Sequence, residues 1–158
     1  MMKRYVVCDI DGTIADNTHR AHLLKDIVES DLHRSAEDMK NDRWTQFYDL
    51  CDKDTPYLDM RSIVKRVAAQ SNIIYLTGRV ERIRQKTSDW LWEHKFPVGG
   101  LAMRANDDFR PNAEFKLAKL SEMGLVPENV LCIFEDNDVD TLRDAGYRVL
   151  HVAKGGLR

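Results

Sequence analysis

Short apolar runs alternate with amphipathic stretches along most of the 158-residue chain. Each run is continuous and rich in Val, Ile, Leu and Tyr, which is typical of strands in a parallel sheet covered on both faces. We therefore predict strands at residues 4–8, 72–76, 101–103, 129–134 and 147–152.

The stretches between these runs place apolar residues at helical spacing, as Ile63 and Val67 do in the first of them. They predict helices over residues 59–70, 80–94 and 112–123. Gly124 and Gly146 follow such stretches, where a glycine can end a helix. Strands and helices that alternate through right-handed crossovers predict an α/β fold, a doubly wound and mainly parallel Rossmann-like sheet.

Residues 14–60 depart from this alternation and show three helical patches instead, at residues 19–29, 35–40 and 44–50. We predict that this segment is a small helical cap, and that residues 1–13 and 61–158 form the core of a single domain. The cap is acidic, because six Lys and Arg face eleven Asp and Glu, a balance of −5. It starts where the first strand ends, so we expect it to cover the edge of the sheet at which open α/β sheets bind ligands.

Composition narrows the class of protein. The chain has 24 Lys and Arg and 26 Asp and Glu, a net charge of −2 that argues against a strongly basic nucleic-acid binder. Its apolar runs are too short to cross a membrane, and Asp9 comes too early for a secretory signal, so we expect a cytoplasmic protein with no membrane partner. Cys8, Cys51 and Cys132 lack the spacing of a disulfide framework or a zinc site.

Two carboxylates follow the first strand, in Cys8-Asp9-Ile10-Asp11-Gly12-Thr13. Residues two apart in extended backbone point the same way, so we expect Asp9 and Asp11 to converge on one site. Paired carboxylates need a cation or a shared proton, and Mg²⁺ prefers oxygen ligands. A simple turn with Gly12 at its tight position is the alternative.

Polar residues also follow the second and fourth strands. Thr77-Gly78-Arg79 offers a hydroxyl, free amides at a glycine turn and a guanidinium, all of which suit phosphate oxygens. Glu135-Asp136-Asn137-Asp138-Val139-Asp140 crowds acids at a strand end, which costs stability unless a cation is near. Lys116 stands between these two motifs in the sequence.

DIDGT, TGR, a lysine and EDxxxD, in this order from Tyr5 to about Val152, resemble the motifs of the haloacid dehalogenase (HAD) superfamily of phosphotransferases. The resemblance implies that Asp9 is the nucleophile that forms an aspartyl-phosphate, and that Asp11 is the general acid and then the base. It further implies that Thr77 and Lys116 hold the transferring phosphoryl group. Asp136 would join Asp9 and the carbonyl of Asp11 around Mg²⁺.

The stretch 103–116 is similar to the MRxxxDxRxDxxxK signature of the 3′-phosphatase domain of phage polynucleotide kinase/phosphatase, with Arg104, Asp108, Arg110 and Lys116 in place. Asn112 departs from it, since that family usually has Asp there, and a glutamate replaces the first acid of its paired aspartates. Two further features are similar to the cap of that family, namely His19-Arg20 and the pattern Trp44, Phe47, Cys51, Asp54, Pro56. The GxxxxGK[ST] loop of a kinase does not occur in the sequence.

The resemblance implies a Mg²⁺-dependent phosphomonoesterase that removes a 3′-phosphate from nucleic-acid ends or nucleotides, with Gly78, Arg79, Arg104 and Arg110 binding the substrate. An acidic cap disfavours a long nucleic-acid footprint. A 5′(3′)-nucleotidase or a small-metabolite phosphatase is therefore the alternative, followed by a non-catalytic HAD-like binding module. The aromatic residues of the cap and Phe109 either stack on a base or pack a small core, and we expect packing for Trp44, Phe47 and Tyr48.

Overall fold

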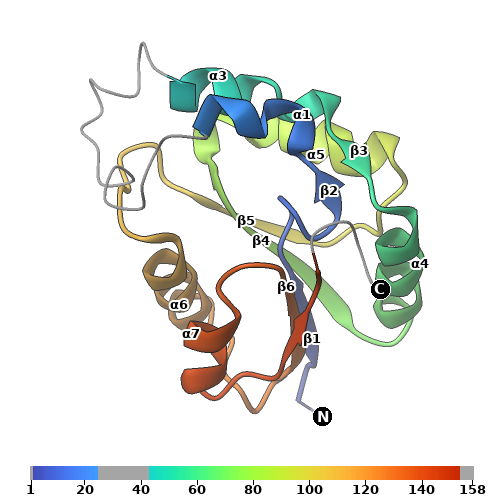
Figure 1. Cartoon of the computed structure of the whole chain (residues 1–158). Coiled ribbons are helices and arrows are strands. Elements are labelled where there is room, and N and C mark those ends of the chain that lie inside the picture. The colour runs from blue at the N-terminus through green and yellow to red at the C-terminus, as the bar shows by residue number, and fades with distance from the viewer. Residues whose placement is uncertain (1, 25–42, 154–158) are drawn as a thin grey trace.

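A parallel five-stranded sheet forms the centre of the computed structural model, which describes residues 2–24 and 43–153 (Figure 1). The strand order is β5-β4-β1-β6-β7. The strands are β1 (Tyr5–Cys8), β4 (Asn72–Val80), β5 (Gly100–Arg104), β6 (Val130–Glu135) and β7 (Val149–His151). All five predicted strands and the α/β class are confirmed. Because the chain builds outward from β1 first on one side and then on the other, the carboxyl end of β1 is a topological switch point, where such sheets bind ligands.

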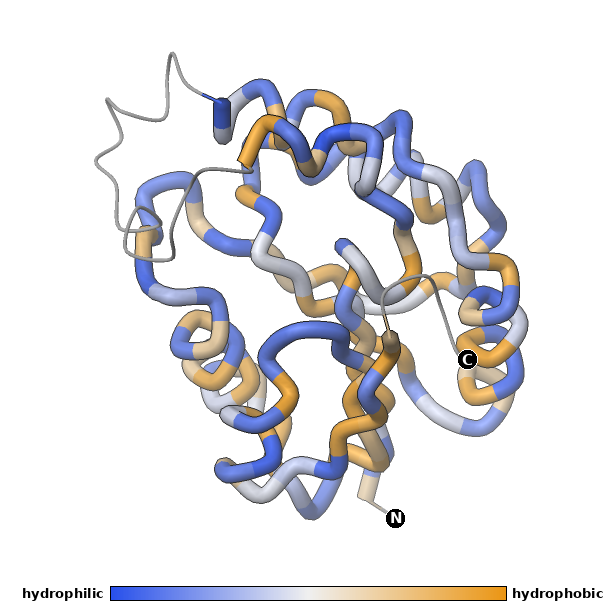
Figure 2. The backbone as a smooth tube through the Cα atoms, viewed as in Figure 1, coloured by the Kyte–Doolittle hydropathy of each residue, from blue (hydrophilic) through white to orange (hydrophobic). Residues whose placement is uncertain are grey.

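Alternate residues of the strands feed two separate cores, one on each face of the sheet. Val6 and Cys8 of β1 pack in one core and Val7 packs in the other, as the pleat of a strand requires. Helices α4 (Leu58–Ala68) and α5 (Arg84–Glu93) bury their apolar sides in the first core, and α6 (Asn112–Glu122) and α7 (Val139–Asp144) in the second. Figure 2 shows the apolar residues concentrated on the strands and on the inner sides of these helices.

The second strand differs from its prediction. β4 continues through the TGR motif to Val80, so the turn expected after Leu76 is wrong, and a 3₁₀ turn η4 (Glu81–Ile83) precedes α5. Leu76 pairs with Ala102 and Val80 with Arg104, which leaves three residues of β4 opposite one residue of β5. Such a bulge redirects side chains near the end of a strand. α4 and α6 confirm two predicted helices, and the short α7 was not predicted.

Short elements above the carboxyl ends of β1 and β4 make up the described part of residues 14–60, the segment predicted to be a cap and called the cap below (Figure 1). β2 (Ala15–Asp16) and β3 (Thr55–Pro56) pair antiparallel, and α3 (Arg43–Asp49) confirms the helical patch expected at 44–50. The other elements are α1 (Thr18–Ala21), η1 (His22–Leu24) and η3 (Cys51–Lys53). Residues 25–29 of the first patch and the patch at 35–40 lie outside the described residues. α4 begins at Leu58, inside the range expected for the cap.

A third core joins the cap to the sheet. Phe47, Tyr48 and Cys51 pack there against residues of β4, η4 and β5. The rings of Trp44, Phe47 and Tyr48 lie 5.8–5.9 Å from one another, which confirms their expected packing. In the described ranges the cysteines are free, and no helix has the length and apolar character to span a membrane.

Candidate active site

Asp9 follows β1 directly and points its buried carboxylate toward the start of the loop after β6. Its N–H donates to the carbonyl oxygen of Phe134 at 3.0 Å, which extends the pairing of β1 with β6 by one residue. The Nζ of Lys116, from α6, lies 3.0 Å from Asp9 Oδ1 and 2.6 Å from Glu135 Oε2. Lys116 Nζ is also 3.6 Å from Asp138 Oδ2. One buried ammonium group therefore faces acids from two strand ends.

Asp9, Glu135 and Asp136 form a cluster whose carboxylate oxygens lie within 4.8 Å of one another. The Thr13 hydroxyl is 3.0 Å from Asp9 Oδ2 and 3.2 Å from Asp136 Oδ1. Gly12 has φ +80°, and a Cβ there would overlap Asp136 Oδ2, so only glycine lets the loop lie against this acid.

Burial and mutual repulsion set the charge of this acid cluster. Burial together with the Glu135 charge raises the pKa of Asp9 to about 7, and burial with the Asp9 charge raises the pKa of Asp136 to about 7. Burial also raises the pKa of Glu135. Burial alone would lower the pKa of Lys116, but the charges of Asp9 and Glu135 outweigh it and keep this lysine protonated. Three carboxylates thus crowd around one ammonium group and hold protons more tightly than usual, and their oxygen ligands fit a hard divalent cation such as Mg²⁺, which would take the place of those protons.

Asp11 has entirely different partners. Its Oδ1 accepts hydrogen bonds from Arg20 Nη2 at 2.6 Å and from Arg79 Nη2 at 2.7 Å. The same two nitrogens donate to Asp54 Oδ2, at 2.6 and 2.9 Å. Burial alone would raise the pKa of Asp11, but the charges of Arg79 and Arg20 outweigh it and lower this pKa to about 2. We call Asp11, Arg20, Asp54 and Arg79 the arginine network.

Arg79 lies inside the fold. Its side chain is fully buried, and it donates to Asp11, Asp54 and the Thr87 hydroxyl. It is absent from the residues that line the cavity, and its guanidinium contacts Asp11; its expected role in substrate binding stays a prediction. The cause is the bulge in β4, which keeps Arg79 within the strand and inside the fold.

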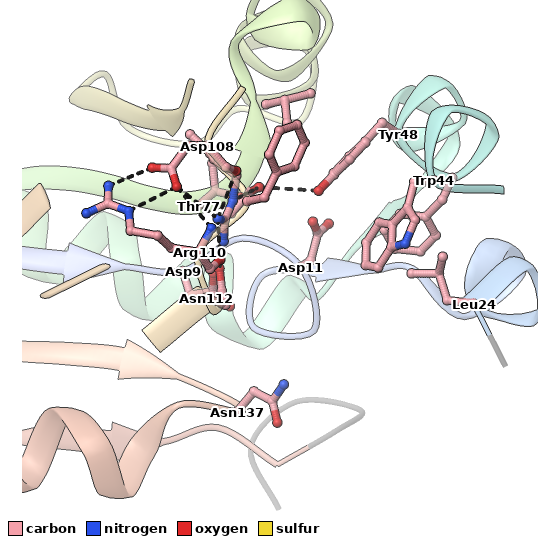
Figure 3. A pocket seen from close by; sticks show the side chains of 15 residues that line it. Asp9, Asp11, Leu24, Trp44, Tyr48, Thr77, Asp108, Arg110, Asn112 and Asn137 are labelled. Carbon is pink, nitrogen blue, oxygen red and sulfur yellow. Dashed lines mark hydrogen bonds and ion pairs between the residues drawn. The ribbon is translucent and has the colours of Figure 1, made fainter. Parts of the chain in front are cut away.

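A cavity of about 320 Å³ opens beside Asp9 and Asp11 (Figure 3). Thr77 and Gly78 line it from β4, and the loop before α6 contributes the rest of that side. The cap supplies an apolar wall opposite, made of Leu24, Trp44, Phe47 and Tyr48. The volume of the cavity is near the lower end of the range for small-molecule sites.

Arg104 and Arg110, the two arginines of the signature, both line this cavity but differ in burial. Arg104 is buried, with its guanidinium 4.7 Å from the Phe115 ring centroid, and it donates to the carbonyl oxygens of Gly78, Asp108 and Arg110. Arg110 is exposed and makes two hydrogen bonds to Asp108, at 3.0 and 2.6 Å. Arg104 thus shapes the loop, and Arg110 presents a cation at the rim of the cavity.

The site groups most of the predicted residues. Asp9, Asp11, Thr77, Gly78, Arg104 and Arg110 line the cavity, while Lys116 and Asp136 contact the Asp9 region from behind. The Asp11 carboxylate does not join the acid cluster, so a role for Asp11 in metal binding would rest on its carbonyl, as the resemblance implies. No role was predicted for Arg20 and Asp54, although both match the cap pattern of the resembling family. His19 Nε2 also lies 2.8 Å from Asp54 Oδ1.

The class of protein comes first, and the fold is HAD-like. A haloacid dehalogenase-like hydrolase from Streptococcus pneumoniae superposes with a TM-score of 0.66 at 15% identity, over 98% of this chain and 86% of the other. An L-2-haloacid dehalogenase gives a TM-score of 0.59 at 16% identity, over 96% and 85%.

The family follows from the sequence profile described as the polynucleotide kinase PNKP phosphatase domain, which matches residues 36–157. The chain belongs to this family. The matched range contains Thr77, Lys116 and Asp136, whereas Asp9 and Asp11 precede it. A search of curated protein sequences gave no match.

A chain in the structure of the Pnkp1/Rnl/Hen1 RNA repair complex is similar in fold, with a TM-score of 0.71 at 22% identity. The superposition covers 98% of this chain and 43% of that chain. The present chain therefore spans less than half the length of this relative.

Proposed function

We propose that this protein is a Mg²⁺-dependent phosphomonoesterase that removes a 3′-phosphate from nucleic-acid ends or nucleotides through an aspartyl-phosphate on Asp9. The observation that carries the proposal is the position of the Asp9 carboxylate. It lines a cavity, Lys116 Nζ lies 3.0 Å from one of its oxygens, and it belongs to the acid cluster with Glu135 and Asp136. A nucleophile, a fixed cation and a set of metal ligands thus meet at one point.

In the first step an Asp9 oxygen attacks phosphorus, and the bond from phosphorus to the alcohol oxygen breaks. Lys116 and Thr77 hold the phosphoryl oxygens, and the protonated form of Asp11 gives a proton to the leaving alkoxide. In the second step water attacks the aspartyl-phosphate, Asp11 accepts the water proton, and phosphate leaves. Mg²⁺, when bound by Asp9, Asp136 and Glu135, supplies positive charge that stabilises the transferring phosphoryl group.

The arginine network affects the two proton transfers of Asp11 differently. With a pKa of about 2, Asp11 is ionised at neutral pH, which suits the acceptance of a proton from water. Protonation of a leaving alkoxide is the harder job for such a group. We therefore expect esters of acidic leaving groups such as p-nitrophenol to react faster than alkyl esters, and to suffer less from Asp11→Asn.

A nucleotide substrate has three kinds of support. The family model describes the phosphatase domain of a polynucleotide kinase, and a chain of similar fold belongs to an RNA repair complex. Trp44, Phe47 and Tyr48 line the cavity with aromatic side chains, and the exposed Arg110 lines it with a cation. The volume of about 320 Å³ favours a single nucleotide unit, which also makes a nucleotidase for mononucleotides the second candidate.

The test is a panel of substrates compared by kcat/KM with Mg²⁺, with EDTA as the control. It includes 3′-phosphorylated oligonucleotides, 3′-mononucleotides, 5′-mononucleotides and sugar phosphates. A clear preference for 3′-phosphates supports the proposal. Activity confined to 5′-mononucleotides overturns the 3′ assignment and keeps the chemistry, whereas no hydrolysis with any divalent metal overturns the phosphatase itself and favours a binding module.

A further inference from the structure

Asn112, the first residue of α6, bridges two charged groups at the edge of the cavity. Its Oδ1 accepts a hydrogen bond from Arg104 Nη2 at 3.2 Å, and its Nδ2 donates to Asp138 Oδ2 at 2.6 Å. A side-chain amide has an accepting end and a donating end, so a cation on one side and a carboxylate on the other fix its orientation.

The backbone of the TGR motif leaves room for this bridge. A Cβ on Gly78 would overlap Asn112 Oδ1, so the absence of a side chain at residue 78 is what admits the amide. Arg104 Nε donates to the Gly78 carbonyl oxygen at 3.3 Å as well. Asn112, Arg104 and Gly78 therefore form one packed corner of the cavity.

The bridge links the substrate side of the cavity to the nucleophile. Arg104 lines the cavity, and Asp138 Oδ2 lies 3.6 Å from Lys116 Nζ, which is 3.0 Å from Asp9 Oδ1. A displacement of Asn112 would move Arg104 at one end and Asp138, with its contact to Lys116, at the other.

Charge explains why this position carries an amide. Lys116 already faces the carboxylates of Asp9, Glu135 and Asp138. A carboxylate at residue 112 would add a further negative charge within hydrogen-bond distance of Asp138, where two ionised acids repel. The amide replaces that repulsion with a donated hydrogen bond and still accepts one from Arg104.

We propose that Asn112 is a positioning residue for the phosphatase reaction, and that its neutral amide is required because Asp138 faces it. This rests on the proposed function. The prediction is specific to this chain, in which Asn112 departs from the aspartate usual in the resembling signature and Asp138 stands opposite.

The test compares the wild type with Asn112→Asp, Asp138→Asn and the double variant, and uses Asn106→Asp as a matched control. Asn106 is exposed in the same loop region and accepts a hydrogen bond from the Arg82 N–H through its Oδ1, away from the cavity lining. We expect Asn112→Asp to lower kcat/KM about 10- to 100-fold, as loss of a supporting hydrogen bond does at other sites. KM should rise at least about fivefold because Arg104 is displaced. The control should stay within about twofold of the wild type.

The double variant exchanges donor and acceptor within the same pair, so it should recover at least about tenfold in kcat/KM over Asn112→Asp. Wild-type kinetics in Asn112→Asp, or a double variant no better than it, overturns the proposal. A fall in kcat with unchanged KM also overturns it, because a displaced Arg104 must raise KM.

Thermal unfolding midpoints of the same proteins separate this proposal from the proposed function. If the wild type hydrolyses no phosphate ester, the phosphatase assignment and the positioning role fail together. A midpoint lowered by Asn112→Asp and regained in the double variant would then still establish the charge match between residues 112 and 138. Additive midpoints would reject the match itself.

Discussion

Two aspartates only two residues apart stand in opposite electrostatic surroundings. Asp9 lies in the acid cluster, where Lys116 is the partner cation in the described structure, and its pKa is about 7. Asp11 lies in the arginine network, where two guanidinium groups face two carboxylates, and its pKa is about 2. The balance of charge around each carboxylate, and not its place in the motif, decides which one is left to bind a cation.

The balanced region also has a structural task. Arg20 comes from α1 of the cap, Asp54 follows η3, and Arg79 comes from β4 of the sheet. Arg20 also donates to the Phe47 carbonyl oxygen at 3.0 Å, and the Trp90 N–H donates to the Asp54 carbonyl oxygen at 2.8 Å. The arginine network therefore links the cap to the core through hydrogen bonds and ion pairs. The acid cluster instead has more carboxylates than cations, and a metal ion would offset this difference.

The largest effect on activity is expected in the acid cluster. Asp9→Asn removes the nucleophile and keeps the shape of the side chain, so kcat should fall at least about 1000-fold, or roughly 4 kcal/mol of transition-state stabilisation. Steady-state hydrolysis of p-nitrophenyl phosphate measures this. Asp144→Asn, at an exposed acid that ends α7 and lies outside the EDxxxD motif, is the control and should leave kcat near the wild-type value. Near-normal turnover by Asp9→Asn would show that another group attacks phosphorus.

Removal of one residue from the arginine network should lower the stability of the fold. Arg20→Ala leaves Asp54 and Asp11 with a single guanidinium in a buried setting, so the free energy of unfolding should fall by about 3–5 kcal/mol. Urea denaturation measures the loss. Arg82→Ala breaks a pair with Asp49 in which both side chains are nearly half exposed, and should cost no more than about 1 kcal/mol. Equal losses in the two variants would mean that the arginine network contributes no more than a surface pair.

The pH dependence of stability should separate the two regions. Folded Asp9 and Asp136 hold protons up to a pKa of about 7, whereas in the unfolded chain they release them near 3.8. The metal-free protein should therefore lose stability as pH rises from about 4 to about 7. Asp11 has the opposite sign, and its contribution is lost only as pH falls from about 4 to about 2.

Mg²⁺ competes with these protons, so it should raise the thermal midpoint more at pH 8 than at pH 5. At a concentration 100 times its dissociation constant the gain is about 2.7 kcal/mol. Asp136→Asn should reduce the Mg²⁺ response. A midpoint insensitive to Mg²⁺ at both pH values would contradict a metal site at the acid cluster.

A smaller effect is expected at Thr13, which is fully buried between Asp9 and Asp136. Thr13→Val removes the hydroxyl and keeps the volume, and should weaken Mg²⁺ binding about tenfold, since groups that support metal ligands matter to this degree. Titration of activity with Mg²⁺ measures the change. Thr13→Ser retains the hydroxyl and should bind Mg²⁺ like the wild type, so equal weakening in both variants would point to packing instead.

Much of the fold was predictable because each strand is a short buried run with its own apolar signature. Val6, Val7 and Cys8 show this for β1, whose alternate residues enter the two cores. The end of β4 was not predictable in the same way. Thr77-Gly78-Arg79 has the composition of a turn, and only the pairing of Val80 with Arg104 across a bulge keeps it in the strand.

The site also contains residues that could be predicted from the sequence and residues that could not. Asp9, Lys116 and Asp136 follow strand ends or stand in a recognisable order, so the sequence indicates that they meet. The arginine network is different, because Arg20 lies 9 residues from Asp11 and 34 from Asp54, and Arg79 lies 68 from Asp11. No local pattern reports such contacts, and burial of paired charges is a property of the tertiary structure.

Trapping of the phosphorylated enzyme tests the role of Asp9 most directly. The protein is mixed with a 3′-phosphorylated nucleotide and Mg²⁺, quenched within one turnover, and reduced with ³H-labelled borohydride, which releases the phosphate and converts an aspartyl-phosphate to ³H-labelled homoserine. Mass spectrometry of the tryptic peptides then locates the changed residue. We expect homoserine at residue 9, and no label in Asp9→Asn. Active enzyme with the label on a different residue would contradict the assignment.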